Sequence, residues 1–359
     1  MSNTRIYLDH AATTPVLPEA RQAMSAALAH WANPSSPHAE GRAARAVLEE
    51  ARWTVSDALG WRHDVIFTSG ASEAVEMAAT RARVDGRVAG ATEHAIVPHA
   101  MGAKSAVVPV DERGLIRVDA LDELLGGGPA LVAIQQVNNE TGVIQPLDEI
   151  APRVRAAGSL LLADCAQSAG KLPLPDADFI AVSAHKLGGP PGIGALLVRD
   201  LATLEPSGGQ EKGYRRGTQD APAAAGFAAA LASRAFCDAM PRLAELRKRL
   251  DDGVRSAGGI VIAGDSPRIA NIGAVALPGA SQASLLVQFD LAGFAVSAGS
   301  ACSSGKMKES HVLKAMKADL AVASSFLRVS FGPQTAEADV DAFLAEWRRI
   351  ADRQSSRAA

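Results

Sequence analysis

The sequence predicts an α/β fold, in which helices cover both faces of a mostly parallel β-sheet. From residue 64 to residue 198, short apolar runs of strand length alternate with segments whose apolar residues recur at helical spacing. Polar residues follow directly after several of these runs, where the carboxyl ends of parallel strands meet and ligands bind. With 48% hydrophobic and 21% charged residues, the chain has enough apolar side chains for a large core.

The first 60 residues predict an extended segment followed by two helices. Residues 7–15 are expected to be extended and to end in a turn. Pro18 suits the first turn of a helix, because its missing N–H is not needed there. A second amphipathic helix is predicted over 41–59, with Gly60 at its C-terminal end.

The alternating region predicts seven strands, each bounded by turn residues or by the start of a helix. Helices are expected after residue 69, after residue 92, near 119–125 and near 147–157. The predicted strands are 65–68, 87–90, 106–110, 130–136, 160–163, 179–182 and 195–198.

The last third of the chain predicts a long helical region and then a smaller α+β unit. We expect Pro241 to interrupt the helical region, and Gly258-Gly259 to mark a domain boundary. The smaller unit has predicted strands near 260–262, 272–276 and 326–330, and a last helix with one apolar face. That face carries Val340, Phe343, Leu344 and Trp347, and only the tail, 354–359, is expected to be unstructured.

Charge and composition exclude several classes of protein. A net charge of −3 with no long basic run argues against nucleic acid as the main partner. The most apolar stretch, 221–231, contains Pro222 and is too short to span a bilayer, and no signal-peptide segment follows the N-terminus. We therefore expect no membrane partner and a cytoplasmic location. The odd number of widely spaced cysteines, Cys165, Cys237 and Cys302, argues against a disulfide framework and a metal site.

Lys186 comes at the end of a predicted core strand, in Ser183-Ala184-His185-Lys186, before a turn rich in glycine and proline. Burying an ammonium group there is costly. A lysine that forms a Schiff base avoids this cost, and desolvation lowers a lysine's pKa in the direction that favours such chemistry. The alternative is a surface lysine in a loop.

Other strand ends carry a set of polar groups that each allow two interpretations. Ala71 and Ser72 begin a helix whose N-terminus suits a phosphate, or Ser72 is an ordinary N-cap. Asp164 suits a protonated ring nitrogen, or it simply starts a helix. His94 suits stacking on a flat ring and proton transfer, although a lone histidine is more often structural.

Asn139 contacts a ring hydroxyl or shapes a turn, and Ser183 and His185 flank the lysine within reach of a phosphate. Arg328 is suited to clamp a substrate carboxylate or forms a structural ion pair.

Cys302 lies among small residues, with Lys306 and Lys308 close behind it in the sequence. This setting favours an exposed, reactive thiolate. Cys165 and Cys237 are instead expected to be buried as small hydrophobic side chains. A lysine for a Schiff base, an aspartate for a pyridinium, a phosphate site, an aromatic stacker and a carboxylate clamp are together what a pyridoxal phosphate enzyme requires.

The assembled pattern resembles the cysteine desulfurases of the class V aminotransferase family, which supply sulfur for iron–sulfur clusters. The resemblance extends from Tyr7 to about Ile350. It implies the fold of type I pyridoxal phosphate enzymes, with a mostly parallel seven-stranded sheet in a large domain (15–257) and a small α+β domain (1–14 and 258–359). The segments that carry it are 8–14, 33–36, 68–73, 92–94, 137–142, 164–167, 183–186, 215–218 and 299–302.

The resemblance also implies a role for each matching residue. Lys186 would carry pyridoxal 5′-phosphate and move the α-proton, His94 would stack on its ring and assist, and the Cys302 thiolate would take the sulfur of L-cysteine as a persulfide, leaving L-alanine. A sulfur-acceptor protein would then receive it. The implied cofactor contacts are Ala71, Ser72, Asn139, Asp164, Gln167, Ser183 and His185, with Thr218 from the second subunit of a homodimer, and the implied substrate contacts are Asn33, Asn139 and Arg328.

The chain departs from the family pattern at four points. Pro191 stands where lysine is usual, Pro333 where arginine is frequent, and Ser72 where threonine is commoner. We also expect the chain to lack the usual C-terminal extension, which in the family often docks a scaffold protein. Two rival interpretations remain: another reaction with the same cofactor, such as that of a selenocysteine lyase or an aminotransferase, or a non-catalytic scaffold of the same fold.

Overall fold

The computed structural model describes residues 5–299 and 309–358, and it confirms the predicted α/β class. A seven-stranded sheet has the order β2-β8-β7-β6-β5-β3-β4. All neighbours are parallel except β8, which runs antiparallel to both β2 and β7. The strands are β2 (Asp64–Thr68), β3 (Gly86–Gly90), β4 (Ala106–Val108), β5 (Ala130–Gln135), β6 (Leu160–Asp164), β7 (Phe179–Ser183) and β8 (Gly194–Val198).

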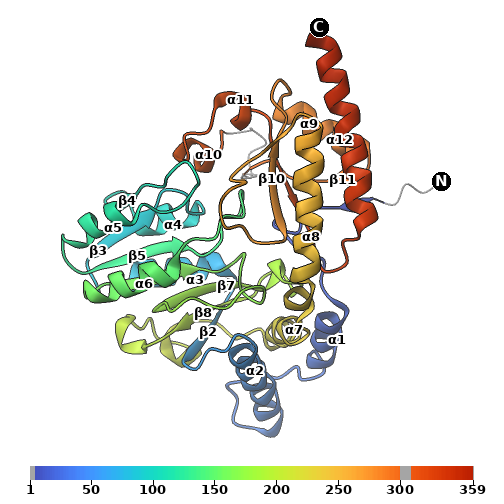
Figure 1. Ribbon diagram of the computed structural model, residues 1–359. Coiled ribbons are helices and arrows are strands. Elements are labelled where there is room, and N and C mark those ends of the chain that lie inside the picture. The colour runs from blue at the N-terminus through green and yellow to red at the C-terminus, as the bar shows by residue number, and fades with distance from the viewer. Residues whose placement is uncertain (1–4, 300–308, 359) are drawn as a thin grey trace.

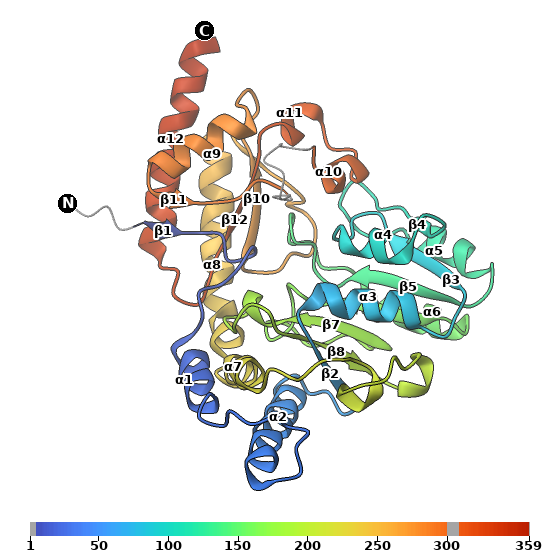
Figure 2. The same ribbon diagram turned by 180° about the vertical axis from the view of Figure 1, so that it is seen from behind.

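Helices cover both faces of this sheet, because its central strands are apolar on both sides. Along β5, Leu131 and Ala133 pack under α3 (Ala71–Arg81) and α4 (Ile96–Met101), whereas Val132 and Ile134 face the opposite layer. Figure 1 shows α6 in front of one face of the sheet. Figure 2 shows the opposite face, with α3 in front of it. The opposite layer contains α2 (Ala39–Ala58), α5 (Val118–Leu125), α6 (Leu147–Ala156) and α7 (Ala221–Ala232), and α1 (Pro18–Ala27) packs against α7.

Two smaller sheets lie at one end of the large one, together with the C-terminal helices (Figure 1). The antiparallel sheet β12-β10-β9 contains the three strands predicted beyond residue 258. The aromatic rings of Phe289 and Phe343 stack 4.6 Å apart beneath Trp347, so the predicted apolar face of the last helix is buried. These elements are β1 (Ile6–Tyr7), β9 (Ile260–Val261), β10 (Ile272–Ala276), β11 (Phe294–Ala295), β12 (Phe326–Ser330), α8 (Ala235–Ser256), α9 (Gln282–Leu291), α10 (His311–Ala315), α11 (Leu320–Ala323) and α12 (Glu337–Ala358).

Two predictions about helices are wrong. Pro241 lies inside α8, and the chain breaks earlier, at Arg234, which has a left-handed backbone with φ of 54°. Packing of the apolar face of α8 outweighs the one hydrogen bond that Pro241 removes. The tail is helical through residue 358, because extending an existing helix costs far less than nucleating one. None of the helices in the described ranges is both long and apolar enough to cross a membrane.

The N-terminal segment joins the large sheet to the smaller ones at the point where β7 ends. Ala11 N–H donates to the Ser330 hydroxyl at 2.8 Å, and Thr14 N–H donates to the His185 carbonyl at 2.8 Å. Residues that are more than 300 positions apart therefore meet beside Lys186.

Candidate active site

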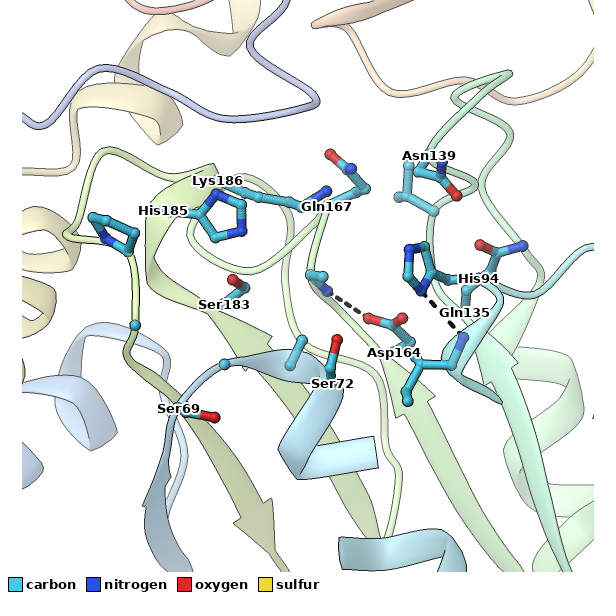
Figure 3. Close-up of a pocket in the computed structure, with 17 residues that line it drawn as sticks. Ser69, Ser72, His94, Gln135, Asn139, Asp164, Gln167, Ser183, His185 and Lys186 are labelled. Atoms are coloured by element: carbon cyan, nitrogen blue, oxygen red, sulfur yellow. Dashed lines mark hydrogen bonds between the residues drawn. The ribbon is translucent and has the colours of Figure 1, made fainter. Parts of the chain in front are cut away.

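A cavity of about 400 Å³ opens where β5, β6 and β7 end and α3 begins (Figure 3). Nine of the residues expected to bind the cofactor line it: Ala71, Ser72, His94, Asn139, Asp164, Gln167, Ser183, His185 and Lys186. The sheet brings them together because parallel strands place their carboxyl ends at one edge.

Lys186 ends a short 3-10 turn, Ala184–Lys186, and its side chain lies in the cavity wall. Its Nζ atom donates to the Ala11 carbonyl at 2.9 Å. Burial, and then the charge of Arg328, lower the pKa of Lys186 to about 8, against the opposing effect of Asp164 and Asp9. The alternative of a surface lysine in a loop is therefore wrong.

Asp164, the last residue of β6, and Gln167 both line the cavity (Figure 3). The Asp164 carboxylate accepts a hydrogen bond from Ala166 N–H at 2.9 Å, and burial raises its pKa. Gln167 Nε2 donates to the Ala11 carbonyl at 2.9 Å, and its Oε1 atom is buried with no hydrogen-bond partner among the described residues. The cavity wall thus includes a carboxylate that has room for a further polar partner and an amide beside it.

The turn before α3 is held by its neighbours. Gly70 is the N-cap and Ser72 lies inside the first helical turn, so Ser72 is not the cap. The Glu73 carboxylate accepts from Ser69 N–H at 2.5 Å and from Arg215 Nε at 2.7 Å. A Cβ atom on Gly194 would lie 2.4 Å from the Val182 carbonyl oxygen and 2.7 Å from Gly70 Cα. Only glycine therefore lets β8 approach this turn.

His94 forms the wall of the cavity that lies across from Lys186 (Figure 3). It lies in the turn before α4, which begins at Ile96, two residues later than expected. The buried Glu93 carboxylate accepts from Gln135 N–H at 2.9 Å and fixes this turn to the end of β5. Partial burial holds the pKa of His94 below its ordinary value, with Asp164 acting in the opposite direction.

His185 and Ser183 complete the wall beside Lys186 (Figure 3). The His185 Nδ1 atom lies 3.1 Å from the Thr13 hydroxyl. Burial, followed by the charges of Lys186 and Lys171, lowers the pKa of His185 to about 4. His185 is therefore neutral at neutral pH.

Three predicted site residues within the described ranges are not among those lining the cavity. The buried Arg328 donates to Asp9 Oδ1 at 2.8 Å and to the Asn139 carbonyl at 2.9 Å, which is the structural ion pair given as its alternative. Asn33 and Thr218 are exposed in loops. Cys302 lies outside the described residues. Of the other cysteines, Cys165 is buried as expected, whereas Cys237 is only partly buried, which corrects that expectation.

The cavity also contains residues that the sequence analysis did not single out. Gln135 is the last residue of β5, and a polar side chain at a strand end is a signal that could have identified it. Val137, Ile96 and Gly192 offered no such signal. Pro191, noted above only as a departure from the family pattern, also lies in the lining.

The model of the family Aminotransferase class-V matches residues 6–343. This chain belongs to that family. An IscS-like cysteine desulfurase from Mycobacterium tuberculosis is 38% identical, over 94% of this chain and 94% of that protein. A cysteine desulfurase from Cereibacter sphaeroides is 35% identical, over 97% of this chain and 96% of that protein. The solved structure of a NifS-like protein from Rickettsia africae matches with a TM-score of 0.90 and 29% identity, over 97% of this chain and 99% of that one.

Class V aminotransferases depend on pyridoxal phosphate, and the cavity fits this group. Asp164 has a raised pKa, and a positively charged ring N–H is the kind of partner that keeps such a carboxylate ionised. Gln167 lines the same space. The start of α3 offers backbone N–H groups to a phosphate.

Proposed function

We propose that this protein is a pyridoxal-phosphate-dependent cysteine desulfurase. It converts L-cysteine to L-alanine, holds the sulfur as a persulfide on Cys302 and passes it to an acceptor protein. One observation carries the proposal: an amine with a pKa near 8 shares a cavity with Asp164, Gln167 and His94. The names of the similar proteins support the same reaction.

Lys186 would hold pyridoxal phosphate, which when bound would supply an electron sink for the α-carbon of a bound amino acid. Asp164 would hold its ring nitrogen, Gln167 its ring hydroxyl, and His94 would stack on its face. Its phosphate would lie at the start of α3, near Ser72 and His185. Because His185 is neutral, it contributes a hydrogen bond rather than a charge to that site.

Lys186 is the residue that we assign to proton movement at the substrate α-carbon. With a pKa of about 8, a substantial fraction of its amine is neutral at pH 7 to 8, so it can take up a proton and return it. His94, with a lowered pKa, is a second neutral base on the opposite wall. The two groups flank the same space from opposite sides (Figure 3).

The sulfur step balances with no outside oxidant or reductant. The Cys302 thiolate forms a bond to the substrate sulfur, and the bond between that sulfur and the substrate β-carbon breaks. The electron pair of the broken bond stays on carbon, which takes up the proton that the Cys302 thiol gave up. L-Cysteine and a protein thiol thus become L-alanine and a protein persulfide.

We further propose the substrate contacts, the subunit contact, the domain boundaries and the cellular location. Arg328, Asn139 and Asn33 would orient the substrate carboxylate, and Thr218, which is exposed in this chain, would reach the phosphate of a second subunit in a homodimer. The large domain would be 15–257, with 1–14 and 258–359 forming the small domain. A cytoplasmic location suits a reaction that needs Cys302 reduced.

Intact-mass measurement after incubation with L-cysteine tests the function. We expect a gain of one sulfur, removed by reductant and located at Cys302 by peptide mapping, with L-alanine formed alongside. A Cys302→Ala protein that binds the cofactor and still releases sulfide at the full rate would refute the mechanism. Turnover of selenocysteine or of a keto acid in preference to L-cysteine would favour the rival reactions.

A further inference from the structure

Glu140 is a buried carboxylate that the reaction described above does not use. Its side chain belongs to a residue that is 1% exposed, and its Oε1 atom has no hydrogen-bond partner among the described residues. Burying a charged group is costly unless the group has a structural or chemical task. The contacts of its other oxygen point to that task.

The Oε2 atom of Glu140 lies close to Gly299 and Ser310, which flank the segment that contains Cys302. On one side, the Ser310 hydroxyl donates to Oε2 at 2.5 Å. On the other side, a Cβ atom on Gly299 would lie 3.6 Å from the same oxygen. The chain therefore leaves Gly299 and returns at Ser310 beside a single carboxylate.

Each end of that segment has a second attachment near the pocket. Before it, Ser297 and Arg328 exchange backbone hydrogen bonds of 3.2 and 2.7 Å. After it, Ser310 caps α10 by accepting from Leu313 N–H, and His311 Nε2 lies 2.9 Å from the Glu93 carbonyl, next to His94. Glu140 lies close to both ends and forms a hydrogen bond with one of them, Ser310.

The turn that holds Glu140 is rigid and also forms the pocket wall. Asn138 Oδ1 accepts from the N–H groups of Glu140 and Thr141 at 2.9 and 2.8 Å, and Asn138 Nδ2 donates to the Thr92 carbonyl at 3.1 Å. The neighbouring residue, Asn139, lines the cavity. One turn thus presents Asn139 to the site and Glu140 to the ends of the segment with Cys302.

We propose that Glu140 is a positioning residue for sulfur transfer, which holds the Ser310 end of the Cys302 segment at a set place relative to the pocket, close to Gly299 at the other end. This inference rests on the proposed function. It separates two parts of the reaction: events at the substrate α-carbon need the cavity alone, whereas sulfur transfer also needs Cys302 delivered to it. Loss of Glu140 slows the second part and spares the first.

The test is a Glu140→Leu variant, which keeps a similar volume and removes the acceptor. Three measurements are compared with the unaltered protein: cofactor absorbance, exchange of the L-alanine α-hydrogen in deuterated water, and the rate of sulfur gain at Cys302 in a single turnover. We expect the first two to change less than about twofold and the third to fall at least about tenfold, since small misplacements of a reacting group are costly.

Matched variants complete the design. Glu140→Gln keeps an acceptor for Ser310 and is expected to retain most of the transfer rate. Ser310→Ala weakens the contact from the other side, and it carries the test if Glu140→Leu fails to fold. Glu309→Leu makes the same chemical change at an adjacent exposed position and is expected to leave all three measurements unchanged.

Two outcomes overturn the proposal. In the first, α-hydrogen exchange and sulfur transfer fall together, which would show that Glu140 serves stability only. In the second, sulfur transfer is unchanged in Glu140→Leu, which would show that the contact has no role. If Glu140→Leu does not fold, unchanged transfer in Ser310→Ala leads to the same conclusion. Sulfur gain at Cys302 in the unaltered protein keeps these results separate from a failure of the proposed function. Without that gain, the proposal for Glu140 falls as well.

Discussion

At the scale of single residues, the environment of Lys186 decides its chemistry. An amine in water has a pKa near 10.5 and is almost entirely protonated at neutral pH. In the cavity, burial and Arg328 disfavour the ammonium form, while Asp164 and Asp9 favour it, and the balance leaves a pKa of about 8. A protonated amine has no electron pair for attack, so this shift makes the residue reactive.

We predict that cofactor-free protein takes up added pyridoxal phosphate at Lys186 at a rate that rises with pH, is half-maximal near pH 8 and levels off at higher pH. Only the neutral amine reacts, and it predominates above the pKa. Arg328→Gln removes a charge that lowers this pKa, so the midpoint should move upward, whereas the exposed Arg249→Gln should leave it in place. Absorbance records the uptake, and borohydride reduction with peptide mapping identifies the residue. A midpoint near 10.5 in the unaltered protein would contradict the prediction.

At the scale of elements, close backbone approaches and one buried ion pair hold the phosphate end of the site. Gly194 allows β8 to lie against the turn that begins α3. The Glu211 carboxylate accepts from Arg52 at 2.7 and 3.0 Å and from Phe67 N–H at 2.8 Å. Glu211 thereby attaches the loop that carries Arg215 to β2, at the cost of a left-handed backbone with φ of 48°.

Gly194→Ala should weaken cofactor binding by at least about tenfold and lower the free energy of unfolding by about 1–3 kcal/mol, as overpacking does. The added Cβ would displace the Gly70 turn, since a backbone carbonyl blocks it on the other side. Titration with pyridoxal phosphate and urea unfolding of the cofactor-free protein measure the two effects. Gly127→Ala, at an exposed helix end, is the control. Unchanged affinity in Gly194→Ala would show that the turn tolerates the shift.

Glu211→Ala should lower the free energy of unfolding by about 3 kcal/mol, because it leaves the buried Arg52 paired with Glu49 alone and the Phe67 N–H without its acceptor. Replacing both side chains, as Arg52→Met with Glu211→Leu, should cost less than the single change. Glu205→Ala breaks an exposed pair with Arg83 and should change the free energy by less than about 1 kcal/mol. Urea unfolding of cofactor-free protein ranks the variants, and a double variant less stable than Glu211→Ala would contradict the argument.

At the scale of the whole molecule, the N-terminal segment couples the large sheet to the smaller ones. His10 lies at this junction, 5% exposed, with its ring packed on Gly332 and edge-on to Tyr7 at 5.0 Å. Burial, and then the charge of Lys171, lower the pKa of His10 to about 4, against a hydrogen bond with the Tyr7 backbone. The folded state therefore requires this histidine to be neutral.

A histidine whose folded-state pKa lies below its unfolded value stabilises the fold fully above pH 6.5, and this contribution is lost as the pH falls from 6.5 toward 4. For His10 the loss reaches about 3 kcal/mol at most. We predict that His10→Asn flattens the decline of the free energy of unfolding in this interval, measured by urea unfolding at several pH values. His30→Asn, an exposed control, should leave the decline as it is. An unchanged decline in His10→Asn would contradict the assignment.

Much of the fold was predictable because strand and helix formation follow local patterns. The seven strands of the large sheet and the strand-end residues around the cavity came from apolar runs and the polar residues after them. The error at Pro241 has another origin: this residue remains helical because α8 packs against the rest of the chain. The pairing of Arg328 with Asp9, which lies 319 positions away, is likewise beyond what local patterns predict.

By itself, the sequence determined the α/β class, the edge of the sheet at which polar groups gather, and the lysine on which the chemistry depends, since these follow from short-range patterns. Only the tertiary structure decided how those groups are charged and held. The Lys186 amine contacts Ala11, 175 positions away, and Glu140 contacts Ser310, 170 positions away. Desolvation and hydrogen bonding depend on which distant segments of the chain meet, and local sequence patterns do not predict those contacts.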